Sequence, residues 1–168
     1  LTWVAQADGT LRGPEPRVYR HETGFVAIDP GSGTGVRADG RIGVLTAPSA
    51  TPSGPACDGD AVGGALSPDA TVWAVACGSG SDEGLHLVGI SEGPLYAVRT
   101  EPGTTGAVAW SPSGATVAVA MGRDNRLVFV DADGGVATTD VDQVRQIVWT
   151  HDGDHLITVH SDGTARWW

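Results

Sequence analysis

The sequence repeats itself at intervals of about 40 residues. The stretch "WSPSGATVAVAMGRDNRLVFVDAD" (110–133) aligns with "WTHDGDHLITVHSDGTARWW" (149–168), and "LSPDATVWAVACGSGSDEGLHLVGI" (66–90) aligns with both. A shorter, degenerate copy is "IDPGSGTGVRADGRIGVLTA" (28–47), and "LTWVAQADGTLRGPEP" (1–16) matches only the second half of the unit. A repeat of this length indicates one small supersecondary unit that is stacked several times.

Each unit contains an apolar strand, a turn with Pro or Gly, a second apolar strand, a turn with Asp, and a third strand. Side chains alternate between two faces along the second strand. One face holds Val117, Val119 and Met121 in the copy at 110–133, Trp73, Val75 and Cys77 in the middle copy, and Leu156, Thr158 and His160 in the last copy. The opposite face of the copy at 110–133 holds Thr116, Ala118 and Ala120. Alternation of period two between Asp-Gly turns is typical of antiparallel hairpins.

One aspartate marks the turn after the second strand in every copy, at separations of 31, 43, 42 and 38 residues. We expect these aspartates to be structural, because a carboxylate in a turn accepts hydrogen bonds from nearby backbone N–H groups. A period near 40 residues with about four short strands is the spacing of a β-propeller blade. The five aspartates are Asp8, Asp39, Asp82, Asp124 and Asp162.

The stretches "AWSPSGATVAVAMGRDNRLVFVD" and "VWTHDGDHLITVHSDGTARWW" resemble WD40 repeats in the Ser-Pro-x-Gly turn, in the Asp of the second turn and in the closing Trp168. The resemblance implies an all-β fold, a β-propeller of four-stranded antiparallel blades. No Gly-His dipeptide occurs in any repeat, and Val130-Asp131 is the nearest counterpart of the Trp-Asp pair. The hydrogen-bonded tetrad of the family is therefore expected to be incomplete. TolB-like and LpqB-like bacterial propellers share this looser pattern.

The strand count predicts a partial propeller that contains parts of about five blades, with further sequence on one or both sides. An open array exposes an apolar blade face, so we expect association through the open blade edges. The expected units are a partial blade (1–20), a degenerate blade (21–55), two blades (56–100 and 101–140) and a blade that lacks its last strand (141–168).

Charge and hydropathy argue against two classes of partner. The net charge is -10, from 20 acidic and 10 basic residues, and every basic residue is Arg. An acidic chain without a basic cluster is a poor ligand for nucleic acid, and no apolar run approaches the ~20 residues that span a membrane. The absence of Lys and the abundance of Ala, Gly, Val and Arg indicate a GC-rich bacterial genome.

No catalytic constellation is recognisable, so we predict a protein that is not an enzyme and that uses no cofactor or metal. His155 and His160 lie five residues apart on a strand and so face opposite sides, which argues against a zinc site with His151. The calcium-like stretches at 58–60 and 131–135 lack a closing Glu. The glycines at 31–36 are interpreted as a hairpin connection, because no Lys follows.

Cys57 and Cys77 are the only cysteines. They form either one disulfide in an exported protein or two unpaired thiols, with Cys77 buried on a strand. The cysteine pair, the linker-like stretch at 46–56 and the missing Lys favour an extracytoplasmic location, whereas the WD40 likeness favours the cytoplasm. The compartment stays open at this stage.

Five of the six tryptophans fall into two groups. Trp73, Trp110 and Trp149 fall within strands and are expected to pack between blades. Trp167 and Trp168 are adjacent, so one points inward and one outward; the outward ring is either an interaction hot spot or a surface covered by a fourth strand.

The predicted function is a non-catalytic propeller for protein–protein interaction, a scaffold or sensor module that is part of a larger bacterial protein. The alternatives are a regulatory or ligand-binding extracytoplasmic propeller, such as a lipoprotein or a receptor-like protein, and, in last place, an enzyme that acts at the propeller channel. An acidic face favours a basic protein partner.

Overall fold

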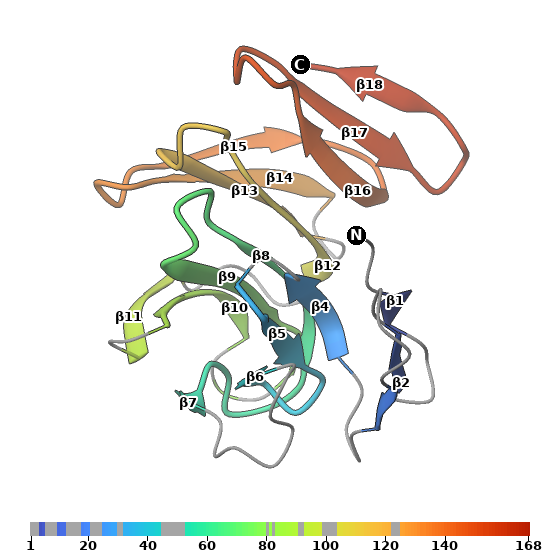
Figure 1. The fold of residues 1–168 in the computed structure, drawn as a ribbon. Coiled ribbons are helices and arrows are strands. Elements are labelled where there is room, and N and C mark those ends of the chain that lie inside the picture. Colours follow the sequence, from blue (N-terminus) through green and yellow to red (C-terminus); the bar gives the residue numbers. More distant parts are fainter. Residues whose placement is uncertain are drawn as a thin grey trace.

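A computed structural model shows an all-β architecture of small antiparallel sheets (Figure 1). The described residues contain eighteen strands in five sheets and no α-helix, and therefore no helix that could cross a membrane. The structure describes residues 4–5, 10–12, 18–20, 25–29, 32–44, 53–79, 81, 83–90, 93–98, 104–121 and 125–168.

The five sheets follow one another along the chain, and in each sheet neighbours in sequence are neighbours in space. The first sheet contains β1 (Val4–Ala5), β2 (Thr10–Arg12) and β3 (Val18–Arg20). The second contains β4 (Phe25–Asp29), β5 (Thr34–Arg37), β6 (Arg41–Val44) and β7 (Ser53–Pro55). The third contains β8 (Ala61–Leu66), β9 (Val72–Cys77), β10 (Gly84–Gly89) and β11 (Gly93–Val98). The fourth contains β12 (Thr104–Trp110), β13 (Thr116–Met121), β14 (Arg126–Asp131) and β15 (Val136–Asp140), and the fifth β16 (Val144–Trp149), β17 (Leu156–His160) and β18 (Ala165–Trp167).

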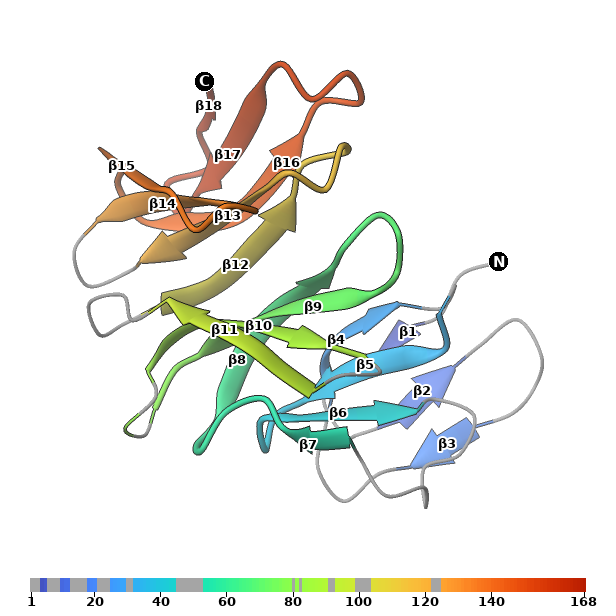
Figure 2. The ribbon, with the colours of Figure 1, turned by 90° about the vertical axis from the view of Figure 1, so that its left-hand side faces the viewer.

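The first strands of successive sheets lie side by side: β4 contacts β8, β8 contacts β12, and β12 contacts β16. The sheets fan out from this row of strands, as the two perpendicular views show (Figures 1 and 2). This is the arrangement of propeller blades around an axis, and it confirms the expected all-β propeller architecture. Among the described strands, the first and fifth sheets share no pairing that would close a ring.

The linker-like interpretation of residues 46–56 is wrong for its last part. Ser53–Pro55 forms β7, which pairs with β6 at the edge of the second sheet. An edge position suits this segment, because proline cannot donate a ladder hydrogen bond and is tolerated where no further strand is paired.

The alternating side chains of the second strands build the cores between sheets. In the fourth sheet Val117, Val119 and Met121 belong to a cluster with Leu85 of the third sheet. On the opposite face of the same strand, the alanines at 118 and 120 belong to a second cluster, which continues into the fifth sheet. The predicted alternation of side chains between two faces is therefore confirmed. The structure adds that the larger side chains of this strand face the preceding sheet and its alanines face the next one.

Tryptophans join the sheets, as expected for packing between blades. The indole N–H of Trp110 donates to the carbonyl of Ala65 at 3.1 Å, and that of Trp149 donates to the carbonyl of Ala109 at 3.2 Å. In both pairs a tryptophan that ends the first strand of one sheet bonds the first strand of the preceding sheet. The buried indole of Trp73 donates instead to the hydroxyl of Thr34 in the second sheet at 3.0 Å.

Candidate binding groove

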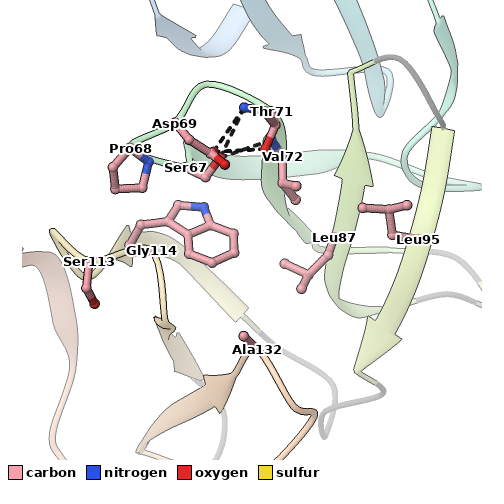
Figure 3. A pocket seen from close by; sticks show the side chains of 11 residues that line it. Ser67, Pro68, Asp69, Thr71, Val72, Leu87, Leu95, Ser113, Gly114 and Ala132 are labelled. Atoms are coloured by element: carbon pink, nitrogen blue, oxygen red, sulfur yellow. Dashed lines mark hydrogen bonds between the residues drawn. The ribbon is translucent and has the colours of Figure 1, made fainter.

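A hollow of about 500 Å³ lies where the third and fourth sheets meet (Figure 3). We call it the interblade groove. Its walls come from the β8–β9 turn, from β9, β10 and β11, from the end of β12, and from the β12–β13 and β14–β15 turns. The lining residues are Ser67, Pro68, Asp69, Thr71, Val72, Leu87, Leu95, Trp110, Ser113, Gly114 and Ala132.

The β8–β9 turn places a carboxylate at the edge of the groove. Oδ1 of Asp69 accepts hydrogen bonds from the Ser67 hydroxyl at 2.6 Å, the Thr71 hydroxyl at 2.8 Å and the Thr71 backbone N–H at 3.2 Å. These bonds, that of Ser67 foremost, lower the pKa of Asp69 below its ordinary value of 3.8. The groove therefore carries a fixed negative charge at neutral pH.

The rest of the groove is mainly apolar. Leu87 and Trp110 extend the core between the third and fourth sheets, and Leu95 on β11 is 47% exposed. Because the Trp110 N–H is already bonded to the Ala65 carbonyl, the indole offers its ring to a ligand rather than its donor. Ala132 lies across the hollow from Asp69 (Figure 3).

Turn packing holds the two sides of the groove in place. A Cβ added to Gly114 would lie 3.6 Å from Cδ of Pro68, so the β12–β13 turn sits directly against the β8–β9 turn. The next pair of sheets repeats the contact, since a Cβ on Gly153 would lie 3.5 Å from Cδ of Pro112. Gly114 and Gly153 have φ of +73° and +79°, which glycine adopts without steric strain.

Asp69 is the only charged residue among those that line the groove, and no basic side chain neutralises it there. The arrangement suits a ligand that offers an apolar group to Leu87, Leu95 and the Trp110 ring, and a cation to Asp69.

Two of the turn aspartates predicted from the repeat, Asp39 and Asp162, are described, and neither lines the groove. Asp162 accepts hydrogen bonds from the backbone N–H of Thr164 at 2.9 Å and from its hydroxyl at 2.7 Å. Asp39, in the turn between β5 and β6, pairs with the guanidinium of Arg37 at 2.8 Å. The remaining three, Asp8, Asp82 and Asp124, lie outside the described residues.

Cys57 and Cys77 form a disulfide, with the two Cα atoms 5.7 Å apart. Both cysteines are buried in the cluster between the second and third sheets. The bond ties the segment that precedes β8 to the end of β9. Neither cysteine lines the interblade groove.

The two final tryptophans differ in environment. The Trp168 indole N–H donates to the hydroxyl of Thr158 at 2.9 Å. Trp167 is 62% exposed, and its ring lies 5.2 Å from that of His155. Trp167 is thus the outward-facing ring, and it does not line the groove.

The histidines of the last repeat do not converge. His160 is buried and bonded to Thr158 and to the carbonyl of Asp142, whereas His155 is exposed. Over the part of the chain that the structure describes, no group of three or more His, Cys, Asp or Glu residues is placed to hold a metal ion.

Sequence reasoning missed Asp69, Leu95 and the role of Trp110 in the groove. The repeat could have pointed to Asp69, because Ser-Pro-Asp at 67–69 aligns with Thr-His-Asp at 150–152. Asp152 in the aligned position also accepts hydrogen bonds, from the Thr150 hydroxyl and the Asp154 backbone N–H. Nothing in the repeat indicates that Leu95 would approach the fourth sheet.

The fold and the groove can be set against known proteins. No protein-family model and no curated protein matches the sequence. Among solved structures, the chain is similar to a WD40 protein in the crystal structure of a mitotic checkpoint complex, with a TM-score of 0.74 and 16% sequence identity. The similarity covers 99% of this chain and 57% of the other. The chain therefore has a WD40-like β-propeller fold, and it spans little more than half the length of the chain it matches.

Proposed function

We propose that this chain is a non-catalytic propeller module that binds a segment of another protein in the interblade groove. The observation that carries the proposal is the groove itself, in which Leu87, Leu95 and the Trp110 ring are among the apolar lining and Asp69 is the one charged lining residue. Apolar pockets with a few placed polar groups are the usual form of binding sites. The similarity to a WD40 protein found in a protein complex supports a role in protein interaction.

The partner segment carries an aliphatic side chain next to a basic one. An aliphatic group would fill the space between Leu95 and Trp110, and an Arg or Lys would pair with Asp69. The net charge of -10 would draw a basic segment toward the protein over longer distances.

A peptide-binding measurement tests this proposal. The probe is a fluorescein-labelled peptide in which Leu and Arg alternate between Gly flanks, and the same peptide with Glu in place of Arg is the control. We expect the Leu/Arg peptide to bind at least about tenfold more tightly, with an affinity that falls as salt rises. Equal binding of the two peptides would overturn the assigned partner chemistry.

A pair of matched substitutions then locates the site. Leu95→Ser removes an exposed apolar side chain of the groove, and Val136→Ser removes one of similar exposure on β15, outside the groove (47% and 54% exposed). We expect Leu95→Ser to weaken peptide binding about tenfold and Val136→Ser to leave it unchanged. If Leu95→Ser binds as tightly as the parent chain, the groove is not the binding site.

The Cys57–Cys77 disulfide supports an extracytoplasmic form of this function, that of a lipoprotein-associated or receptor-like propeller. The lysine-free composition supports a bacterial source, and the 57% span supports membership of a larger protein. Fractionation of the source cells, with an antibody that detects the chain in each fraction, tests the compartment. Recovery of the chain only from the cytoplasm would contradict an extracytoplasmic location.

A further inference from the structure

The outer strand of the fourth sheet lacks the irregularities of the outer strands before it. In the second sheet, β7 contains Pro55 and its pairing with β6 shifts register; in the third, β11 contains Pro94 and its pairing with β10 shifts register. Those two edges also contact one another. By contrast, β15 contains neither proline nor glycine and pairs with β14 in one unbroken register, at the side of the sheet farthest from β12 (Figure 2). Prolines and bulges are common blocks on exposed edges, so the edge of β15 is open to a further strand.

Hydrogen bonds at the two ends of the β14–β15 hairpin show which backbone groups point outward. The N–H of Asp131 donates to the carbonyl of Gly135 at 2.9 Å, and the N–H of Val141 donates to the carbonyl of Asn125 at 2.6 Å. In an antiparallel pair every second residue bonds the neighbouring strand, so the odd-numbered residues of 135–141 bond β14. The residues of β15 whose N–H and C=O groups point away from β14 are therefore Val136, Thr138 and Asp140.

The side chains of these three residues lie on one face of the sheet. Their partners on β14 include Val128 and Val130, which belong to the cluster between the third and fourth sheets. Val136 is 54% exposed at one end of the row, and Asp140 is exposed at the other. An incoming strand would therefore meet an apolar side chain and a carboxylate that are four residues apart on the same face.

The charge around this edge favours a basic partner. Asp131 and Asp133 precede β15 in the hairpin, and Asp140 closes the strand. Arg126, the ladder partner of Asp140, is the one basic residue of the hairpin sequence 126–140. A second copy of the chain would bring the same carboxylates and a net charge of -10 to the edge, so charge repulsion argues against pairing of two copies here.

We propose that the outer edge of β15 binds an extended segment of a second protein, which adds to the fourth sheet as an antiparallel fifth strand. The segment has a basic residue opposite Asp140 and a β-branched residue opposite Val136, as in Arg-Thr-Thr-Thr-Val. The alternating Leu/Arg peptide assigned to the interblade groove does not match this edge, because it places one residue type opposite both Val136 and Asp140. The edge is thus a second interaction surface, separate from the groove.

Fluorescence anisotropy with a labelled peptide tests the partner chemistry. The probe is Arg-Thr-Thr-Thr-Val between Gly flanks, and the control has Glu in place of Arg. We expect the Arg peptide to bind at least about tenfold more tightly than the Glu peptide, because Glu would face Asp140. Absence of binding by the Arg peptide, or equal binding of the two peptides, would overturn the proposal.

Two N-methylated versions of the Arg peptide test the backbone pairing on the unaltered chain. A methyl group on the nitrogen of the central Thr removes the donor that would face the carbonyl of Thr138. A methyl group on the nitrogen of the Thr beside it points away from β15 and serves as the matched control. We expect the first to weaken binding at least about tenfold and the second to leave it within about twofold. An equal effect of the two methyl groups would overturn strand addition.

Substitutions in the chain then locate the surface. Thr138→Pro removes an outward N–H and leaves the bonds between β15 and β14 in place, because proline is tolerated where the N–H faces solvent. We expect Thr138→Pro to abolish binding of the Arg-Thr-Thr-Thr-Val peptide and to leave binding of the Leu/Arg peptide unchanged, and Leu95→Ser to do the converse. A folded Thr138→Pro chain that binds the first peptide as tightly as the parent, or loss of that binding in Leu95→Ser, would overturn the proposal.

Two further results separate the remaining outcomes. If Thr138→Pro does not melt cooperatively, the two N-methylated peptides decide the matter on the parent chain. Sedimentation of the 168-residue chain examines the rival occupant, a second copy. A dimer that Thr138→Pro dissociates would show that two copies pair at β15 and would overturn the assignment to a basic partner.

Discussion

The indole N–H of Trp168 donates to the hydroxyl of Thr158 at 2.9 Å, and that hydroxyl lies 2.8 Å from Nε2 of His160. The other ring nitrogen, Nδ1, donates to the carbonyl of Asp142. With the His160 ring neutral and its proton on Nδ1, every donor and acceptor in this chain of hydrogen bonds has a partner. The Trp168 N–H donates to Thr158, the Thr158 hydroxyl donates to Nε2 of His160, and Nδ1 donates to the carbonyl of Asp142. The chain lacks a Gly-His dipeptide, yet a tryptophan, a threonine and a histidine are linked within this one blade.

Removal of the central hydroxyl should destabilise the fifth sheet. Thr158 is 0% exposed, so Thr158→Val leaves the Trp168 N–H and the His160 Nε2 without a partner at almost constant volume. We expect the free energy of unfolding to fall by about 2 kcal/mol. Urea denaturation measures it, with the exposed Thr138→Val on β15 as the control. Equal losses in the two variants would show that the hydrogen-bonded chain contributes little.

Two turns should respond in opposite directions to exchange of Ala and Gly. Ala70 has φ of +58° in the β8–β9 turn, where the equivalent residue of the next sheet is Gly114 at +73°. A Cβ is disfavoured at such angles, so Ala70→Gly should stabilise the chain by about 0.5–1 kcal/mol and Gly114→Ala should destabilise it by about 1 kcal/mol. Thermal melts of both variants supply the comparison. The prediction is wrong if the two midpoints shift in the same direction.

Stability should fall in acid because of the turn carboxylates. Hydrogen bonds lower the pKa of Asp152, chiefly that from the Thr150 hydroxyl, and of Asp162, chiefly that from the Thr164 backbone N–H, from the ordinary value of 3.8. A carboxyl with a lower pKa in the folded chain stabilises it above the unfolded value. That contribution is lost as the pH falls from 3.8 through the lowered pKa.

Urea titrations at pH 6 and at pH values below 3.8 test the acid effect. Asp152→Asn/Asp162→Asn, which cannot titrate at these positions, should lose less stability between the two conditions than the parent chain. Both carboxylates are exposed, so the difference should be small. An identical loss in the two proteins would assign the acid sensitivity to other groups.

Reduction of the disulfide should weaken the contact between the second and third sheets. Cys57 and Cys77 are 20 residues apart, and a cross-link over a loop of this size stabilises a folded chain by about 3 kcal/mol on the chain-entropy estimate. Cys57→Ala/Cys77→Ala should lower the free energy of unfolding by about that amount. A thiol assay in denaturant should find no free thiol before reduction and two after it; two free thiols in the untreated protein would exclude the bond.

The local architecture could be predicted from the sequence because it depends on alternation within single strands. Val117 and Ala118 face opposite neighbours, as the period of two implies. Trp110 and Trp149 also pack between blades as expected, since an aligned tryptophan at the end of a first strand has the same neighbour in each copy.

The groove could not be predicted in this way. Leu95 and Trp110 come together only when two sheets are placed beside one another, and the repeat contains no information on the angle between sheets. The cysteines show a related limit. A spacing of 20 residues permits a disulfide. Whether the two Cα atoms come close enough for the sulfur atoms to bond depends on how the segment before β8 runs beside β9.

The size difference between the two faces of the third and fourth sheets gives this part of the array a polarity. Gain or loss of one whole repeat places a large-residue face against an alanine face again, as between the third and fourth sheets, so the number of blades can change without redesign of the interfaces. Where successive sheets pair a large-residue face with an alanine face, duplication in steps of about 40 residues preserves that pairing, which is a route by which a repeat protein can lengthen during evolution.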